Sequence, residues 1–83
     1  MLKHRQIEAF RAIIIGGSMS TAAGIMGITQ PAISRLIRDL EHETRLNLFE
    51  RTGGRLIATG DAMALYREVD RSFQGLERIL DLA

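Results

Sequence analysis

The chain has 83 residues, a quarter of them charged, no cysteine and a formal net charge of +1 at pH 7. This length predicts one domain with a small core, and the lack of cysteine excludes disulfides and thiolate chemistry. No apolar run approaches the roughly 20 residues of a membrane span and the first ten residues lack a signal-peptide core, so we expect a cytoplasmic protein.

The charges are divided unevenly along the chain. Residues 1–60 hold eight Lys or Arg against five Asp or Glu, which gives +3. Residues 61–83 hold three against five, which gives −2. A basic head and an acidic tail fit a head that contacts phosphate and a tail that lies away from it, although random scatter also gives differences of this size.

Two helices are predicted in the first third of the chain. The first spans residues 3–15, and its apolar residues recur with spacings of 3 and 4 at Ile7, Phe10 and Ile14. Gly16 and Gly17 end it, and Ser18 is the expected N-cap of a short helix over residues 19–26. Ala22 and Ala23 are small enough to let two helices approach closely.

A third helix is predicted from residue 30 to about residue 44. Gly27 supplies the turn before it, Thr29 is a good N-cap, and Pro31 falls in the first turn, where a missing N–H does no harm. One face is apolar: Ile33, Leu36, Ile37 and Leu40. The other face carries Gln30, Ser34, Arg35 and Arg38.

The polar face of this third helix has the groups that bond base edges and phosphates: amide, hydroxyl and guanidinium. Residues 18–46 therefore indicate a helix-turn-helix with an exposed recognition helix. The same spacing also fits an ordinary helical hairpin with a solvated polar face.

A short hairpin is predicted after the third helix. Residues 50–52 and 55–57 can pair across Gly53 and Gly54, since a Gly pair suits the positive φ angles of a two-residue turn. This hairpin would be the wing of a winged helix. Arg55 lies nearest the tip and is predicted to enter the minor groove; the alternatives are a phosphate contact or an ion pair with Glu50.

The last predicted helix covers residues 60–82, with Thr59 as its N-cap. It carries a heptad-like seam, with spacings of 4 and 3 in alternation: Ala62, Tyr66, Val69, Phe73, Leu76, Leu80 and Ala83. Such a helix is about 35 Å long, too long to bury its whole stripe on a head this small. We expect a second copy of the chain to cover the seam; the alternative is that the helix folds back on its own head.

No other pattern in the sequence predicts a catalytic, metal or phosphate site. His4 and His42 lie far apart with no cysteine to join them, which predicts no metal site. The serines have no adjacent base in a known nucleophile motif, and neither Gly pair matches a phosphate-binding loop. We therefore expect no enzyme activity, no metal and no cofactor.

Three motifs in sequence resemble a known family. They are S-x-x-x-A-A from Ser18, T-Q-P-A-I-S-R-L-I-R-D-L-E from Thr29, and L-F-E-R from Leu48. Together they resemble the N-terminal winged helix-turn-helix of LysR-type transcriptional regulators, and the resemblance runs from Leu2 to the last helix. It implies a mainly α fold, with a three-helix core, a short β-hairpin wing and a long C-terminal linker helix.

The resemblance also implies how the chain works. In this family the linker helices pair antiparallel in a homodimer, which binds an interrupted palindrome in double-stranded DNA. Residues 1–59 would be the DNA-binding domain and residues 60–83 the linker helix, with an effector-binding domain, and so any small-molecule effector, expected only in a longer protein. The sequence as a whole most resembles members of this family that sense opines or basic amino acids.

Eleven residues are predicted to contact DNA, from the polar face of the third helix and from the matching motif positions. They are Ser18, Thr21, Thr29, Gln30, Pro31, Ala32, Ser34, Arg35, Arg38, Arg51 and Arg55. The predicted dimer interface consists of Ala62, Tyr66, Val69, Phe73, Leu76 and Leu80. The alternative function is a protein-interaction module that uses the helix over residues 60–83.

The chain departs from the family pattern in three places. Thr44 and Arg45 stand where a Leu-Gly pair is usual, so the end of the recognition helix is expected to be longer or differently capped. Gly54 stands where a wing arginine is frequent. The T-x-A-G opening that is usual for the linker helix reads Thr59, Gly60, Asp61 and Ala62 here, so that only the threonine matches.

Overall fold

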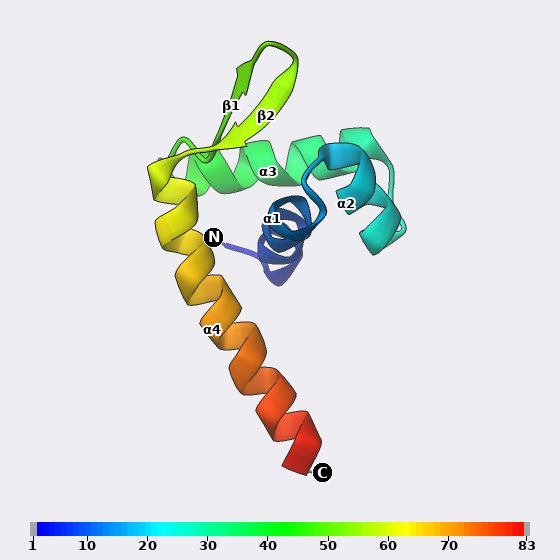
Figure 1. The fold of residues 1–83 in the computed structure, drawn as a ribbon, viewed down its shortest axis with the longest axis vertical. Helices are drawn as coiled ribbons and strands as arrows, with labels where there is room; N and C mark the ends of the chain where they lie inside the picture. The colour runs from blue at the N-terminus through cyan, green and yellow to red at the C-terminus, as the bar shows by residue number, and fades with distance from the viewer. Residues whose placement is uncertain (1, 83) are drawn as a thin grey trace.

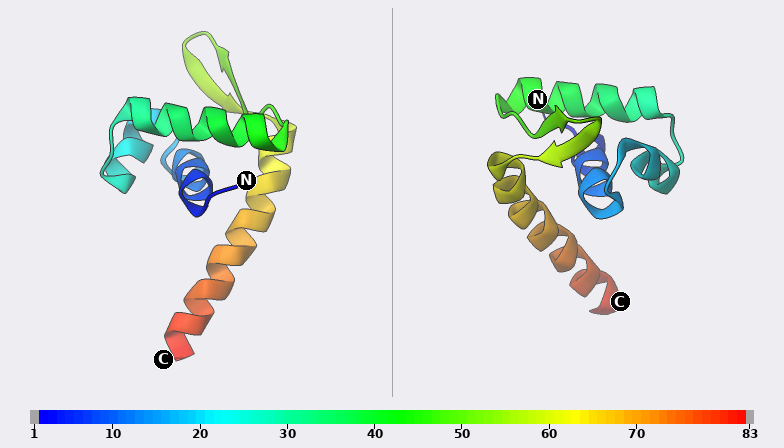
Figure 2. Two further views of the ribbon diagram at one scale, coloured as in Figure 1. Left: turned by 180° about the vertical axis from the view of Figure 1, so that it is seen from behind. Right: turned by 45° about the horizontal axis from the view of Figure 1, so that its top comes forward.

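The computed structural model describes residues 2–82, which form four helices and one two-stranded antiparallel hairpin (Figures 1 and 2). In chain order these are α1 (His4–Gly16), α2 (Met19–Met26), α3 (Gln30–Thr44), β1 (Phe49–Thr52), β2 (Arg55–Ala58) and α4 (Gly60–Leu82). The predicted fold class is confirmed, with helix limits within one residue of expectation. The predicted seam position Ala83 lies outside the described residues.

Helix α1 begins and ends at local signals. The buried Gln6 side chain accepts a hydrogen bond from the Lys3 backbone N–H at 2.9 Å. At the other end Gly17 has a φ of 83°, and its N–H donates to the Ile13 carbonyl at 2.8 Å. This left-handed residue ends the helix at low cost because glycine has no Cβ.

The core lies between α1, α2 and α3, with Phe10 at its centre. The Phe10 ring is fully buried and meets Phe49 of β1 with ring centroids 5.8 Å apart. Ala22 and Ala23 are both buried, and α2 contacts both α1 and α3. Each large side chain buried here contributes about 2 kcal/mol relative to an exposed one.

The end of α3 explains the first departure from the family pattern. The Thr44 hydroxyl donates to the Leu40 carbonyl at 2.8 Å and accepts from the Leu46 N–H at 3.3 Å. Arg45 follows with a φ of 58°, the one positive φ outside glycine in residues 2–82. The helix is therefore not longer; it is capped by a threonine and a left-handed arginine in place of a glycine.

The wing has the predicted two-residue turn. Gly53 and Gly54 have φ angles of 58° and 77°, and the strands pair in the register Glu50↔Ile57, Arg51↔Leu56 and Thr52↔Arg55. One more pair, Phe49↔Ala58, ties the base of the hairpin to the core. The tip projects away from the head on the side of α3 (Figure 1).

Helix α4 divides into two halves. Its start is fixed by Thr59, whose hydroxyl donates to the Asn47 carbonyl at 2.5 Å and accepts from the Ala62 N–H at 3.1 Å. Its first half packs on the head, and its second half runs away from the head into solvent (Figures 1 and 2).

This division corrects the predicted dimer interface. Ala62 is 0% exposed and Val69 is 6% exposed within the single chain, so neither has surface left for a partner. The prediction is wrong for these two residues, because both are already buried within the single chain, where α4 contacts α1 and β2. Tyr66 and Phe73 are half-buried against the same head, whereas Leu76 and Leu80 are 50% and 65% exposed.

Phe73 marks the boundary between the two halves. Its ring stacks on His4, with centroids 6.3 Å apart, and lies under the Arg11 guanidinium, 4.3 Å from the ring centroid. Both partners lie on α1, so Phe73 fixes this part of α4 against the head. A cation–π contact of this kind contributes about 0.5–1 kcal/mol at a partly exposed site.

Candidate nucleic-acid interface

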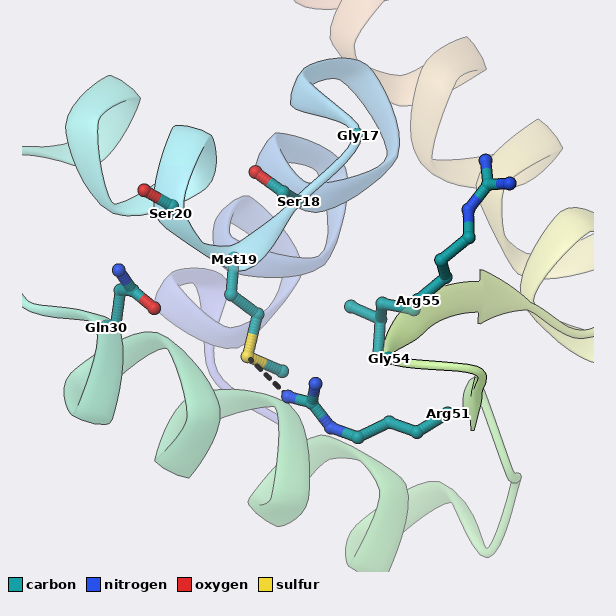
Figure 3. A pocket seen from close by; sticks show the side chains of 9 residues that line it. Gly17, Ser18, Met19, Ser20, Gln30, Arg51, Gly54 and Arg55 are labelled. Atoms are coloured by element: carbon teal, nitrogen blue, oxygen red, sulfur yellow. Dashed lines mark hydrogen bonds between the residues drawn. The ribbon is translucent and has the colours of Figure 1, made fainter.

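One concave surface collects the start of α2, the start of α3 and the wing (Figure 3). It has a volume of about 390 Å³ and is called the wing hollow below. Its lining residues are Gly17, Ser18, Met19, Ser20, Gln30, Arg51, Gly54, Arg55 and Leu56. Three segments that lie far apart in the sequence therefore share one surface.

The N-terminus of α2 opens on the wing hollow. The Ser18 hydroxyl oxygen accepts from the Thr21 N–H at 3.0 Å, and the same hydroxyl donates to Thr21 Oγ1 at 3.0 Å. A single cap leaves other first-turn N–H groups of the helix unpaired by the chain. These N–H groups and the positive end of the helix dipole favour an anion such as a phosphate.

The N-terminus of α3 is built in the same way. Thr29 Oγ1 accepts from the Ala32 N–H at 3.2 Å, and Pro31 occupies the first turn as predicted. Thr29 and Ala32 thus hold the helix start, and Gln30 between them is exposed at the edge of the wing hollow.

The rest of the predicted face of α3 lies outside the wing hollow. Ile33, Ile37 and Leu40 are buried on the opposite side, which fixes the rotation of the helix. That rotation turns Arg35 and Arg38 to solvent and leaves Ser34 half-buried. Because an α-helix repeats every 3.6 residues, Gln30, Ser34 and Arg38 follow one line along the exposed face.

The two wing arginines diverge. Arg51 reaches from β1 across the wing hollow toward α2, where its Nη2 lies 3.9 Å from the Met19 sulfur (Figure 3). Arg55 points away from Arg51 (Figure 3). Its strand partner is Thr52, not Glu50, and within residues 2–82 the structure has no ion pair between Arg55 and Glu50.

The structure brings four predicted residues to the wing hollow: Ser18, Gln30, Arg51 and Arg55. All eleven predicted DNA-contacting residues are exposed or half-buried. Sequence reasoning missed Met19 and Ser20, although both directly follow the Ser18 cap. Their position in the first turn of a capped helix was the signal that pointed to them.

Residues 2–82 contain no cluster of three His, Cys, Asp or Glu side chains that would hold a metal ion. None of the helices in that range is both long and apolar enough to cross a membrane.

Comparison with known proteins decides what this head is. The family described as "Bacterial regulatory helix-turn-helix protein, lysR family" matches residues 4–63. The chain belongs to this family. It is a LysR-type helix-turn-helix DNA-binding domain, as the three sequence motifs predicted.

Curated relatives support the assignment. The chain is 56% identical over 79 residues to the regulatory protein NocR of Agrobacterium fabrum, and 56% identical to the octopine catabolism/uptake operon regulatory protein OccR of Rhizobium meliloti. It is 42% identical to the transcriptional activator protein LysR of Escherichia coli. These matches cover 95% of this chain but only 25–27% of the relatives, so the chain spans about a quarter of their length.

Solved structures show the same fold. The complex of the BenM DNA-binding domain with catB site 1 DNA has a TM-score of 0.88 at 25% identity, covering 98% of this chain and 91% of that one. The complex of the CbnR DNA-binding domain with DNA has a TM-score of 0.84 at 28% identity, covering 96% and 92%. The relatives named above are regulatory proteins by name.

Proposed function

We propose that this domain binds double-stranded DNA sequence-specifically as a homodimer, with α3 in the major groove and the wing at the minor groove or the backbone. The observation that carries the proposal is that Gln30, at the start of α3, lines the same hollow as Arg51 and Arg55 of the wing. These three side chains are exposed, as are Arg35 and Arg38 further along α3.

The dimensions fit this arrangement. A helix with its side chains is about 10–12 Å wide, and the major groove is about 12 Å wide. For contacts with base edges, Gln30 supplies an amide and Arg35 a guanidinium, each able to form two hydrogen bonds to one base, and Ser34 supplies a hydroxyl. The N-termini of α2 and α3 and Arg38 supply groups for phosphates, which fix the position of the helix in the groove.

The wing contributes through two different arginines. Arg55 lies beside the slim Gly53-Gly54 tip and is assigned to the minor groove, where a narrow A·T-rich segment attracts an inserted arginine. Arg51 is assigned to the backbone, because it is directed into the hollow that opens at the N-terminus of α2.

Dimerisation is assigned to the second half of α4. Leu76, Ile79 and Leu80 form a bare apolar stripe there, and antiparallel pairing of two such helices would present the two heads to an interrupted palindrome. Residues 1–59 are assigned to DNA binding and residues 60–83 to linking. Since residues 62–73 pack on the head, the first half of the linker also belongs to the folded core of the head.

We assign the binding of any small-molecule effector to a further domain of a longer protein, as in the family. We assign the protein to the bacterial cytoplasm, because the DNA is there. No enzymatic step is assigned to the domain.

Selection of bound sites from random duplex DNA tests the function directly. We expect an enriched sequence with two inverted half-sites. Absence of any enriched sequence would contradict specific binding. A protein-interaction module would bind DNA weakly or not at all, and its affinity for a protein partner would barely respond to salt. The logarithm of a DNA-binding constant instead falls with the logarithm of the salt concentration, with a slope of about −0.9 per phosphate neutralised.

Single substitutions then test the assigned roles on the selected site. Arg35→Ala and Ser34→Ala should each weaken specific binding by roughly 1–3 kcal/mol, and less so on scrambled DNA. Arg55→Ala should weaken binding most on sites with A·T-rich flanks. Arg51→Ala should weaken binding equally on sites with A·T-rich and with G·C-rich flanks. Equal losses for both arginines on both flanks would remove the minor-groove role of Arg55.

A further inference from the structure

Leu48 ties three parts of the chain together at the base of the wing. Its side chain is 0% exposed, and its N–H donates to Glu41 Oε2 on α3 at 2.8 Å. Its carbonyl accepts from the N–H of Thr59, the residue that caps α4, at 3.0 Å. A single residue directly before β1 therefore joins the recognition helix, the wing and the start of α4.

The Glu41 carboxylate holds the first strand of the wing from the side of α3. Its Oε2 accepts a second hydrogen bond, from the Phe49 N–H at 3.4 Å, and the side chain is half-buried. Glu41 lies in the last turn of α3, where the helix dipole disfavours a negative charge. The two N–H donors offset that cost, because hydrogen bonds to a carboxylate are roughly twice as strong as bonds between neutral groups.

The direction of the wing is set at this base. Residues 50–55 are exposed, and the tip projects away from the head (Figure 1). The Phe49 ring meets Phe10 in the core, but apolar contacts are not directional, whereas hydrogen bonds are. The four residues of β1 span about 13 Å, so a tilt of about 10° at the base would move the tip by about 2 Å.

We propose that Glu41 is the positioning residue of the wing: it sets where Arg55 meets the DNA, and so which flanking sequence the domain prefers. This inference rests on the proposed function, in which Arg55 enters the minor groove while α3 lies in the major groove. Glu41 belongs to α3 and holds the wing, so the two contacts keep a fixed spacing. A displacement of about 2 Å at the tip is large against a minor groove about 6 Å wide.

A purely structural role for Glu41 predicts a different result. A loss of folding stability lowers the fraction of active protein and weakens binding to every operator by the same factor. The ratio of the affinities of one protein for two operators cancels that fraction. The readout is therefore the preference for A·T-rich over G·C-rich flanks around one selected site, measured at fixed salt.

Two conservative substitutions separate the reach of the side chain from its charge. Glu41→Asp keeps the carboxylate but is one methylene shorter, so it should lose the bond to the Leu48 N–H. Glu41→Gln removes the charge but retains an acceptor oxygen at the same distance along the side chain. We expect Glu41→Asp to lower the flank preference nearly as far as Arg55→Ala does, and Glu41→Gln to retain most of it. The Leu48 amide should exchange its hydrogen roughly tenfold faster in Glu41→Asp than in the parent.

Glu77→Asp is the matched control, since it shortens an exposed glutamate of α4 by the same methylene. It should leave the flank preference unchanged. A Glu41→Asp protein with the flank preference of the parent would overturn the positioning role and leave the proposed function intact. A larger loss in Glu41→Gln than in Glu41→Asp would overturn it as well. A parent without any flank preference would instead remove the minor-groove role of Arg55, and this inference with it.

Discussion

The two halves of α4 have the same periodicity but different surroundings. In the first half the stripe packs on the head, where α4 contacts α1 and β2, and Ala62 and Val69 are buried. In the second half the same stripe is bare, with Ile79 and Leu80 64% and 65% exposed. A repeat of apolar residues thus specifies which face of a helix is buried, and does not specify what buries it.

Length explains where the change occurs. Helix α1 has 13 residues and α4 has 23, which correspond to about 20 Å and 35 Å of helix. Phe73 is the residue of α4 at which the ring contacts with α1 occur. Beyond it, α4 runs away from the head (Figure 1). The four substitutions below separate folding effects from dimer effects along this helix.

Val69→Asp should have the largest effect. It places a carboxylate in the core of the single chain, and an unpaired buried charge of this kind costs about 3–5 kcal/mol of folding stability. Urea unfolding followed by circular dichroism measures the loss. Ala64→Asp, at an exposed position of the same half, is the control and should cost less than about 0.5 kcal/mol.

Leu80→Asp should leave the fold unchanged and strongly weaken dimerisation. The side chain is exposed in the single chain, so the carboxylate remains solvated unless a second copy covers it. We expect a loss of roughly 2–3 kcal/mol in dimer free energy, measured by sedimentation, with an unfolding midpoint equal to that of the parent monomer. A variant that still dimerises at the parent concentration would show that the bare stripe is not the interface.

Phe73→Leu tests the residue at the boundary. It retains apolar volume but removes the ring that contacts His4 and Arg11, and should cost about 1 kcal/mol of folding stability in a urea titration. Phe73→Asp would be a poor test of the dimer interface, although Phe73 lies at the centre of the predicted seam. The new carboxylate would lie beside the Arg11 guanidinium of the same chain. An unfolding curve identical to the parent's would argue that α4 is not held at this point.

Gly75→Ala should have the smallest effect, and in the opposite direction. A Cβ at Gly75 would meet only the end of the flexible Arg78 side chain, at 3.8 Å. Alanine should therefore stabilise the helix by about 0.5–1 kcal/mol, seen as a higher unfolding midpoint. If a second helix approaches closely at Gly75 in the dimer, the same change would weaken dimerisation, which sedimentation would reveal.

Much of the fold followed from local signals in the sequence. Ser18, Thr29 and Thr59 cap the three helices that they were predicted to cap, and Gly53 with Gly54 sets the hairpin register. The spacing of Ile33, Ile37 and Leu40 determined which face of α3 is exposed. These features depend on residues a few positions apart, so the sequence alone was enough to predict them.

Tertiary structure decided which distant segments meet. Met19 and Arg51 are 32 residues apart, and only the folded head brings the start of α2 to the wing. Arg45 adopts a left-handed conformation that sequence patterns assign to glycine, because the bonds of Thr44 and the carboxylate of Glu41 on the Leu48 N–H hold the chain there. Which part of the α4 stripe is buried depends in the same way on where α4 meets the rest of the chain. Packing in three dimensions sets that boundary, and the periodicity of a helix does not reveal it.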